Sequence, residues 1–145
     1  MRALVQRVKE ASVAVGDEIV GSIGAGICVF VGVTHDDTVA TAVSMADKVW
    51  NLRVMPDADG VMNRSVGDTT KAVLVVSQFT LYGDTARGRR PSWIAAARPD
   101  HAEPIVEAVA ARLRELGAVV ATGRFRTDMQ IALVNDGPVT LMLEL

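Results

Sequence analysis

Apolar residues recur along the chain in two patterns, one typical of strands and one typical of helices. A continuous apolar run at 27–33 and a Val-rich segment at 72–79 predict strands that are buried. A period of two over residues 139–145 predicts a half-buried strand. In all, strands are expected at 1–9, 12–15, 18–23, 27–33, 72–79, 118–122, 129–134 and 139–145.

Helical spacing of apolar residues appears in two segments. Residues 37–53 form one amphipathic pattern, and the preceding segment 34–37 offers an N-cap. The second helix is expected to begin with Asp100 as its cap and to end near Gly117. Its apolar face would consist of Ile105, Val109, Leu113 and Leu116. Two helices among these strands predict an α/β (α+β) protein with an antiparallel-rich, barrel-like sheet as its core and two main helices packed on it.

Length and composition narrow the class of protein. A chain of 145 residues suggests one domain, spanning 1–145. Half of the residues are hydrophobic, yet no run approaches the roughly 18 apolar residues of a membrane span. Four charged residues within the first ten argue against a signal peptide. We therefore expect a cytoplasmic protein that makes no use of a membrane and hides part of its apolar surface in an oligomer.

The residues that usually carry metal or acid–base chemistry are scarce. With one Cys and two His, the chain offers neither an internal disulfide nor a His/Cys zinc site, and no cofactor is expected. His35 and His101 are expected at surface or capping positions, and Cys28 in the core. No nucleophile–base pair is evident.

Charge is informative locally rather than over the whole chain. The formal net charge of −2 gives no sign of a nucleic-acid ligand. Between Thr85 and Pro99, however, there are four arginines and no acidic residue. Such a loop is compatible with phosphate binding and, equally, with simple exposure to solvent.

Two polar motifs are candidates for a site. Ser77-Gln78-Phe79-Thr80 follows an apolar strand, where its hydroxyl, amide and backbone N–H groups can stabilise an oxyanion during acyl transfer or simply end the strand. Asn135-Asp136-Gly137-Pro138 is typical of a hairpin turn, but Gly137 also permits close approach of the backbone to a ligand. A cis bond before Pro138 would turn two carbonyls to the same side as a rigid recognition edge.

Together these segments resemble the D-aminoacyl-tRNA deacylase family, of the D-tyrosyl-tRNA deacylase type. The likeness runs along the whole chain, and its two signature motifs are Ser77-Gln78-Phe79-Thr80 and Asn135-Asp136-Gly137-Pro138-Val139-Thr140. It implies hydrolysis of the ester between a D-amino acid and the 3′-terminal adenosine of tRNA, with glycyl-tRNA as a further substrate. It also implies a homodimer in which a cis Gly-Pro edge reaches into the partner's active site and excludes L-amino acids.

The resemblance also assigns roles to individual residues. Ser77, Gln78, Phe79 and Thr80 would form the catalytic end of the pocket, with backbone N–H groups near Gln78 and Phe79 as oxyanion donors. The substrate would be bound by Gly137, Pro138, Asn135, Arg7, Phe125 and Met129, of which Phe125 and Met129 hold the adenine and Arg7 steadies the Gly-Pro segment. Where the family often has Gly-Ala after this Phe, the chain has Arg126-Thr127.

Three hypotheses for function follow. The first is the deacylase, with either Thr80 or the terminal ribose 2′-hydroxyl as the activating group. The second is a tRNA-binding module without catalysis, which predicts salt-sensitive binding without turnover. The third is a small-molecule esterase with Thr80 as its nucleophile, although no activating base is evident in the sequence.

Overall fold

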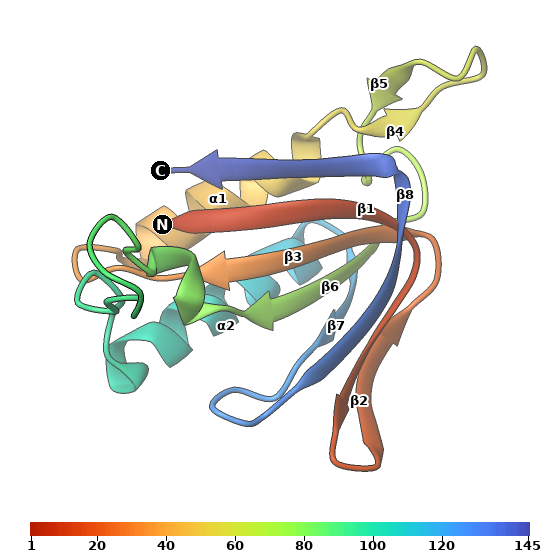
Figure 1. The fold of residues 1–145 in the computed structure, drawn as a ribbon. Helices are drawn as coiled ribbons and strands as arrows, with labels where there is room; N and C mark the ends of the chain where they lie inside the picture. The colour runs from red at the N-terminus through yellow and green to blue at the C-terminus, as the bar shows by residue number, and fades with distance from the viewer.

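The computed structural model describes all residues from 1 to 145, and its elements form one curved sheet with two long helices (Figure 1). The strands are β1 (Arg2–Val15), β2 (Glu18–Ile23), β3 (Gly26–Gly32), β4 (Met55–Pro56), β5 (Met62–Arg64), β6 (Ala72–Ser77), β7 (Val119–Thr122) and β8 (Gln130–Glu144). The helices are α1 (Val39–Asn51), the 3₁₀ helix η1 (Phe79–Tyr82) and α2 (Pro99–Glu115). Neither long helix has the length and apolar character needed to cross a membrane.

The main sheet is mixed and nearly closed. Its strand order is β2-β1-β3-β6-β7, with β8 paired to β1 outside this path. The three pairs made by β1 are antiparallel, whereas β3 pairs with β6, and β6 with β7, in parallel. The sheet curls until β2 meets β7 so closely that a Cβ atom on Gly21 would overlap the carbonyl oxygen of Thr122. The predicted fold class, a barrel-like sheet with two helices, is confirmed.

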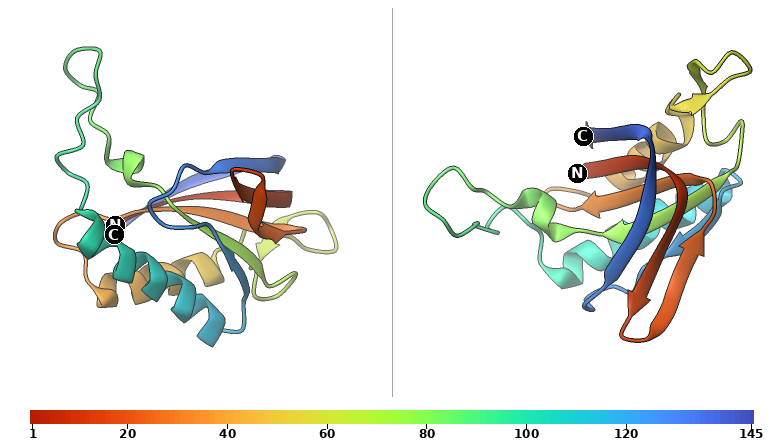
Figure 2. Two further views of the ribbon diagram at one scale, coloured as in Figure 1. Left: turned by 90° about the horizontal axis from the view of Figure 1, so that it is seen from below. Right: turned by 45° about the vertical axis from the view of Figure 1, so that its right-hand side comes forward.

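Apolar side chains are buried on both faces of this sheet. Both helices cover one face (Figure 2, left), where Ile27, Val29 and Val31 belong to the larger core. The alternate residues Cys28 and Leu74 point to the inside of the curl and form a second core. Because both faces are covered, β3 and β6 are continuous apolar runs rather than alternating ones.

The helices start slightly later or earlier than the sequence patterns suggest. α1 begins at Val39, and its N-cap is Thr38, which shares a capping box with Thr41. Asp37 is engaged elsewhere: one carboxylate oxygen accepts from the amino group of Met1 at 2.8 Å and the other from the N–H of Thr34 at 2.8 Å. The expected cap within 34–37 is therefore wrong.

The second helix also differs at its start. Its N-cap is Arg98, Pro99 occupies the first helical turn and Asp100 lies within that turn instead of capping it. A proline is well suited to this place, since the first turn has no intrahelical acceptor for its missing N–H. An acidic residue in the first turn still favours the helix through its dipole.

Three expected strand boundaries are also wrong. β6 ends at Ser77, and the chain turns into η1 rather than continuing to residue 79. Arg2–Val15 is one strand, and so is Gln130–Glu144, without a hairpin at 135–138. β1 pairs with β8 on both sides of that segment, with register shifts near Val8, so that β8 bends without reversing.

Candidate active site

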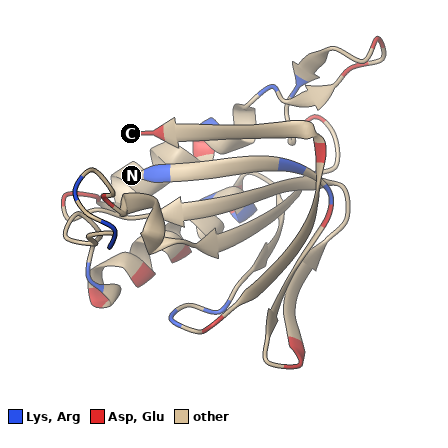
Figure 3. Cartoon of the chain, in the orientation of Figure 1, with Lys and Arg blue, Asp and Glu red and all other residues tan.

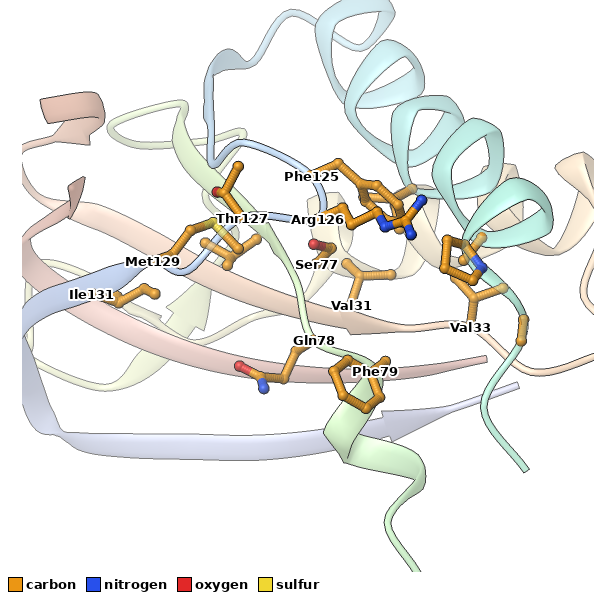
Figure 4. A pocket seen from close by; sticks show the side chains of 15 residues that line it. Val31, Val33, Ser77, Gln78, Phe79, Phe125, Arg126, Thr127, Met129 and Ile131 are labelled. Atoms are coloured by element: carbon orange, nitrogen blue, oxygen red, sulfur yellow. The ribbon is translucent and has the colours of Figure 1, made fainter. Parts of the chain in front are cut away.

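An apolar pocket with a volume of about 430 Å³ opens at the C-terminal end of β6. Residues from β3, β6, α2 and the segment between β7 and β8 surround it. Figure 4 shows Phe125 and Arg126 on one side of the pocket and Gln78 and Phe79 on the other. Of the residues predicted for the site, those lining it are Ser77, Gln78, Phe79, Phe125 and Met129.

The backbone at the end of β6 supplies unpaired donors. Ser77 is the last residue of the β3–β6 ladder, and the N–H of Gln78 donates to the carbonyl oxygen of Val31 at 2.7 Å. Beyond this point the N–H groups of Phe79 and Thr80 have no acceptor in the chain, as is usual for the first turn of a helix. Phe79 and Thr80 therefore have N–H groups free to donate to a bound molecule, whereas the N–H of Gln78 is engaged by the sheet. The expected oxyanion role of N–H groups near Gln78 and Phe79 stays a prediction.

Thr80 lies beside the pocket, and its hydroxyl oxygen accepts from the side-chain amide of Gln78. Among the residues that line the pocket, Arg126 is the one titratable side chain. A guanidinium stays protonated and does not act as a general base. The pocket therefore has no imidazole or carboxylate positioned to activate the Thr80 hydroxyl.

The opposite wall comes from the segment between β7 and β8. Phe125 and Met129 both face the pocket, and the Thr127 hydroxyl donates to the carbonyl oxygen of Arg124 at 2.8 Å. Arg126 has φ +57°, a left-handed conformation that is uncommon outside glycine. Arg126 was not among the predicted site residues, although the wall that Phe125 and Met129 form was anticipated.

Helix α2 completes the pocket with Pro99, Ala102 and Val106. None of these residues was predicted for the site. Ala102 and Val106 are four residues apart and adjoin the predicted apolar face, so helical spacing alone carried a signal for them. Their contribution is apolar wall rather than chemistry.

The second motif forms a braced bend in β8. The Gly137–Pro138 peptide bond is cis, and Gly137 has φ +128°. The Asn135 side chain spans the bend: its oxygen accepts from the N–H of Val139 at 3.1 Å, and its amide donates to the Thr140 hydroxyl at 2.8 Å.

Arg7 fixes the same bend from β1. Its Nε donates to the carbonyl oxygen of Asp136 at 3.0 Å, and its Nη1 donates to the carbonyl oxygen of Val54 at 2.7 Å. Arg7 and Asn135 thus hold the segment that contains Gly137 and Pro138. These four residues belong to the group that the resemblance assigned to substrate binding, and that role stays a prediction.

The two groups of predicted residues do not meet within one chain. Arg7 pairs with Ile27, which pairs in turn with Val73 near the start of β6. Ser77 is four residues further along β6, or ~13 Å at the usual rise of a strand. Neither the bend nor Arg7 lines the pocket.

The histidines and the cysteine take no part in this pocket. A ring nitrogen of His35 is 2.7 Å from the carbonyl oxygen of Ile94, and one of His101 is 2.9 Å from that of Asp37. Burial raises the pKa of the Cys28 thiol to about 12, which leaves it unreactive at neutral pH. No group of three or more His, Cys, Asp or Glu side chains is arranged to hold a metal ion.

An apolar pocket with unpaired backbone donors at one end has groups that can stabilise an oxyanion during acyl transfer. The family model described as D-Tyr-tRNA(Tyr) deacylase matches residues 4–144. The chain belongs to this deacylase family.

Individual relatives agree with this assignment, and two solved structures have the same fold. A D-aminoacyl-tRNA deacylase from Thermus aquaticus is 56% identical over 144 residues, covering 99% of this chain and 95% of the relative. One from Nocardia farcinica is 58% identical over 147 residues, covering 99% of each. The structure titled c-Myc DNA Unwinding Element Binding Protein superposes with a TM-score of 0.94 at 39% identity, covering 100% of this chain and 99% of the other. A probable eukaryotic D-amino acid tRNA deacylase (TM-score 0.85, 16% identity, 99% and 98% coverage) shares the fold.

Proposed function

We propose that the chain hydrolyses the ester bond of D-aminoacyl-tRNA and releases the free D-amino acid and tRNA. The observation that carries this proposal is the pair of unpaired N–H groups, at Phe79 and Thr80, beside an apolar pocket in a member of a deacylase family. An ester needs little more than this, because its carbonyl is already reactive and positioning plus oxyanion stabilisation supplies much of the rate.

In the proposed reaction, a water molecule adds to the ester carbonyl carbon and gives up one proton, which passes through the terminal ribose 2′-hydroxyl to the 3′-oxygen. The carbonyl oxygen gains negative charge and accepts hydrogen bonds from the N–H groups of Phe79 and Thr80. Collapse of this intermediate breaks the bond to the 3′-oxygen of the terminal adenosine, which leaves with a proton. Phe125 and Met129, on the opposite wall, would hold the adenine by apolar contact.

Activation through the terminal ribose 2′-hydroxyl fits this site better than attack by Thr80. The Thr80 hydroxyl is engaged by Gln78, and no base lines the pocket. An unactivated hydroxyl is a weak nucleophile. The small-molecule esterase with a threonyl intermediate is therefore the less favoured alternative.

This choice predicts different results for two substitutions. With tRNA that ends in 2′-deoxyadenosine and carries the amino acid on its 3′-oxygen, hydrolysis should fall at least about a hundredfold. Thr80→Val should lose roughly tenfold or less, because it removes one side-chain hydrogen bond and leaves the backbone donors in place. Single-turnover rates measure both. Complete loss in Thr80→Val, together with an acyl-enzyme seen by mass spectrometry, would establish Thr80 as the nucleophile instead.

We further propose that Gly137 and Pro138 of a second copy complete the pocket and read the configuration of the amino acid. Within one chain the bend lies away from the pocket but is braced by Arg7 and Asn135, as a recognition edge requires. Exposed apolar side chains on β8, which include Val134, Leu141 and Met142, support a buried contact between two copies. A backbone edge would contact the amino group and leave no room for an L side chain, whereas glycine has none to exclude.

The direct experiment compares tyrosyl-tRNA of both configurations. Purified protein should cleave D-tyrosyl-tRNA and glycyl-tRNA and leave L-tyrosyl-tRNA intact, which release of labelled amino acid would measure. Equal cleavage of the D and L forms would refute the chiral role. Salt-sensitive binding of tRNA without cleavage of any form would support the non-catalytic binding module instead.

A further inference from the structure

We infer that the loop between η1 and α2, residues 84–98, is a phosphate-binding arm for the strand of tRNA that leads to the 3′-terminal adenosine. This inference rests on the proposed function, because it assigns a second contact to the same substrate. The loop is called the arginine arm below, after Arg87, Arg89, Arg90 and Arg98.

The arginine arm projects from the body of the molecule (Figure 2, left) and carries several of the basic positions in Figure 3. All four of its arginines are exposed, and none forms a salt bridge. Most other arginines have carboxylate partners, such as Arg2 with Glu144 and Arg112 with Asp47. Unpaired guanidinium groups on one loop are free to bind phosphate, for which their planar fork is well suited.

The base of the arm is firmly anchored, although its tip is exposed. Asp84 and Ser92 exchange two backbone hydrogen bonds of 2.8 Å. The Asp84 carboxylate accepts from the N–H of Ala86 at 2.8 Å, so the one acid at the base is occupied within the turn. The Thr34 hydroxyl donates to the carbonyl oxygen of Ala95 at 2.7 Å from the neighbouring β3–α1 connection. An anchored base keeps the arginines in one place relative to the fold.

The arm is also fixed to the catalytic end of the pocket. The rings of Phe79 and Trp93 pack edge to face with centroids 5.3 Å apart, and Phe79 is the residue whose N–H is unpaired. At the other end of the arm, Arg98 lies between Ala97 and Pro99, which both line the pocket. Arg126 lines the pocket from the opposite wall and also lacks a carboxylate partner. Unpaired positive charge therefore extends from the pocket outward along the arm.

The length of the arm suits several nucleotides. Gly88 is four residues from the anchored Asp84, which allows a reach of about 13 Å. A nucleic-acid strand advances about 3.4 Å per phosphate in a stacked duplex, so this reach corresponds to roughly four nucleotides. With the adenosine in the pocket, the arginines at 87, 89 and 90 would meet the phosphates that precede it.

The experiment compares two substrates with a matched pair of variants. D-Tyrosyl-tRNA carries the phosphates, whereas D-tyrosyl-adenosine has none for the arm to contact. The arm variant is R89Q/R90Q. Its control is R53Q/R64Q, which removes two exposed arginines from the segment around β4 and β5. Neither of these arginines lines the pocket.

For R89Q/R90Q we expect the KM for D-tyrosyl-tRNA to rise about tenfold. The slope of log KM against log salt should decrease by about 1.4, because each phosphate contact on a single strand contributes about 0.7 and two are lost. Its rate on D-tyrosyl-adenosine should stay within about twofold of wild type, and R53Q/R64Q should match wild type on both substrates. An unchanged KM and salt slope, or an equal loss on both substrates, would overturn the inference. Filter binding of uncharged tRNA tests the arm without any cleavage. Weaker binding by R89Q/R90Q, with R53Q/R64Q binding as wild type, would support the arm even if the wild-type protein cleaved neither substrate. Failure of the wild-type protein to cleave either substrate would overturn only the proposed function.

Discussion

At the scale of single residues, Gly137 has a backbone conformation and close neighbours that suit no residue with a side chain. Its φ of +128° lies in a region that residues with a Cβ rarely adopt. A Cβ atom there would lie 2.9 Å from Nη2 of Arg7 and 2.9 Å from Cγ2 of Val139. The residue that steadies the bend is thus also the one that an added methyl group would displace.

Gly137→Ala should therefore damage the bend and its proposed reading of configuration. We expect a loss of about 1–3 kcal/mol in the free energy of unfolding and a fall of at least about tenfold in kcat/KM for D-tyrosyl-tRNA. Gly60→Ala is the matched control, since Gly60 also has positive φ, at +79°, but open space around it. Urea unfolding and steady-state kinetics measure the two effects. Full activity in Gly137→Ala would contradict the role assigned to this position.

At the scale of elements, the contact between β2 and β7 closes the curl of the sheet. Gly21 on β2 approaches the backbone of Thr122 on β7 more closely than any side chain permits. β7 leads directly into the pocket wall that contains Phe125, so this contact affects both the core and the site.

Gly21→Val should force β2 and β7 apart. Overpacking of this kind costs about 1–3 kcal/mol, and we expect a clearly lower melting temperature in a thermal scan. Gly24→Ala serves as the control, because Gly24 has no atom within 4 Å of an added Cβ and an ordinary φ. Equal melting temperatures for the two variants would show that the β2–β7 approach has no structural importance.

The elements were largely predictable from sequence, whereas their ends were less so. Apolar periodicity located both helices and the buried strands β3 and β6, because the side chains that make the core also set the period. Asn135-Asp136-Gly137-Pro138 has the local chemistry of a turn, so the sequence predicted a hairpin there. The pattern of residues in β8 cannot show that β1 is long enough to pair with it on both sides of this segment. The end of β6 was misplaced because Gln78 and Phe79 continue an extended pattern while the chain already turns into η1.

At the scale of the whole molecule, the two halves of the candidate site lie apart in one chain. Periodicity and spacing locate motifs along the sequence, but the separation of the two motifs follows from the register of β1, β3 and β6. That register depends on long-range pairing. The sequence therefore indicated which residues belong to each motif, whereas the distance between the two motifs is known only from the fold.

This separation leads to a complementation test of the proposed dimer. A pocket variant, Phe79→Pro, which removes one of the two unpaired N–H groups, and a bend variant, Gly137→Val, should each be nearly inactive as pure dimers. Refolded together in equal amounts, they should regain about a quarter of wild-type activity, since half of the dimers are mixed and each of these carries one intact site. Light scattering would confirm the dimers. No recovery in a mixture shown to contain mixed dimers would refute the sharing of sites between copies.

The unpaired amides of Phe79 and Thr80 have a consequence for genetics as well as for chemistry. Every residue except proline brings the same N–H group, so exchanging these side chains leaves the donors in place. An alanine scan would then assign little importance to the atoms that stabilise the reacting oxygen. Only a change in the backbone itself, such as an ester in place of the amide at residue 79 or 80, would reveal how much of the catalytic rate they supply.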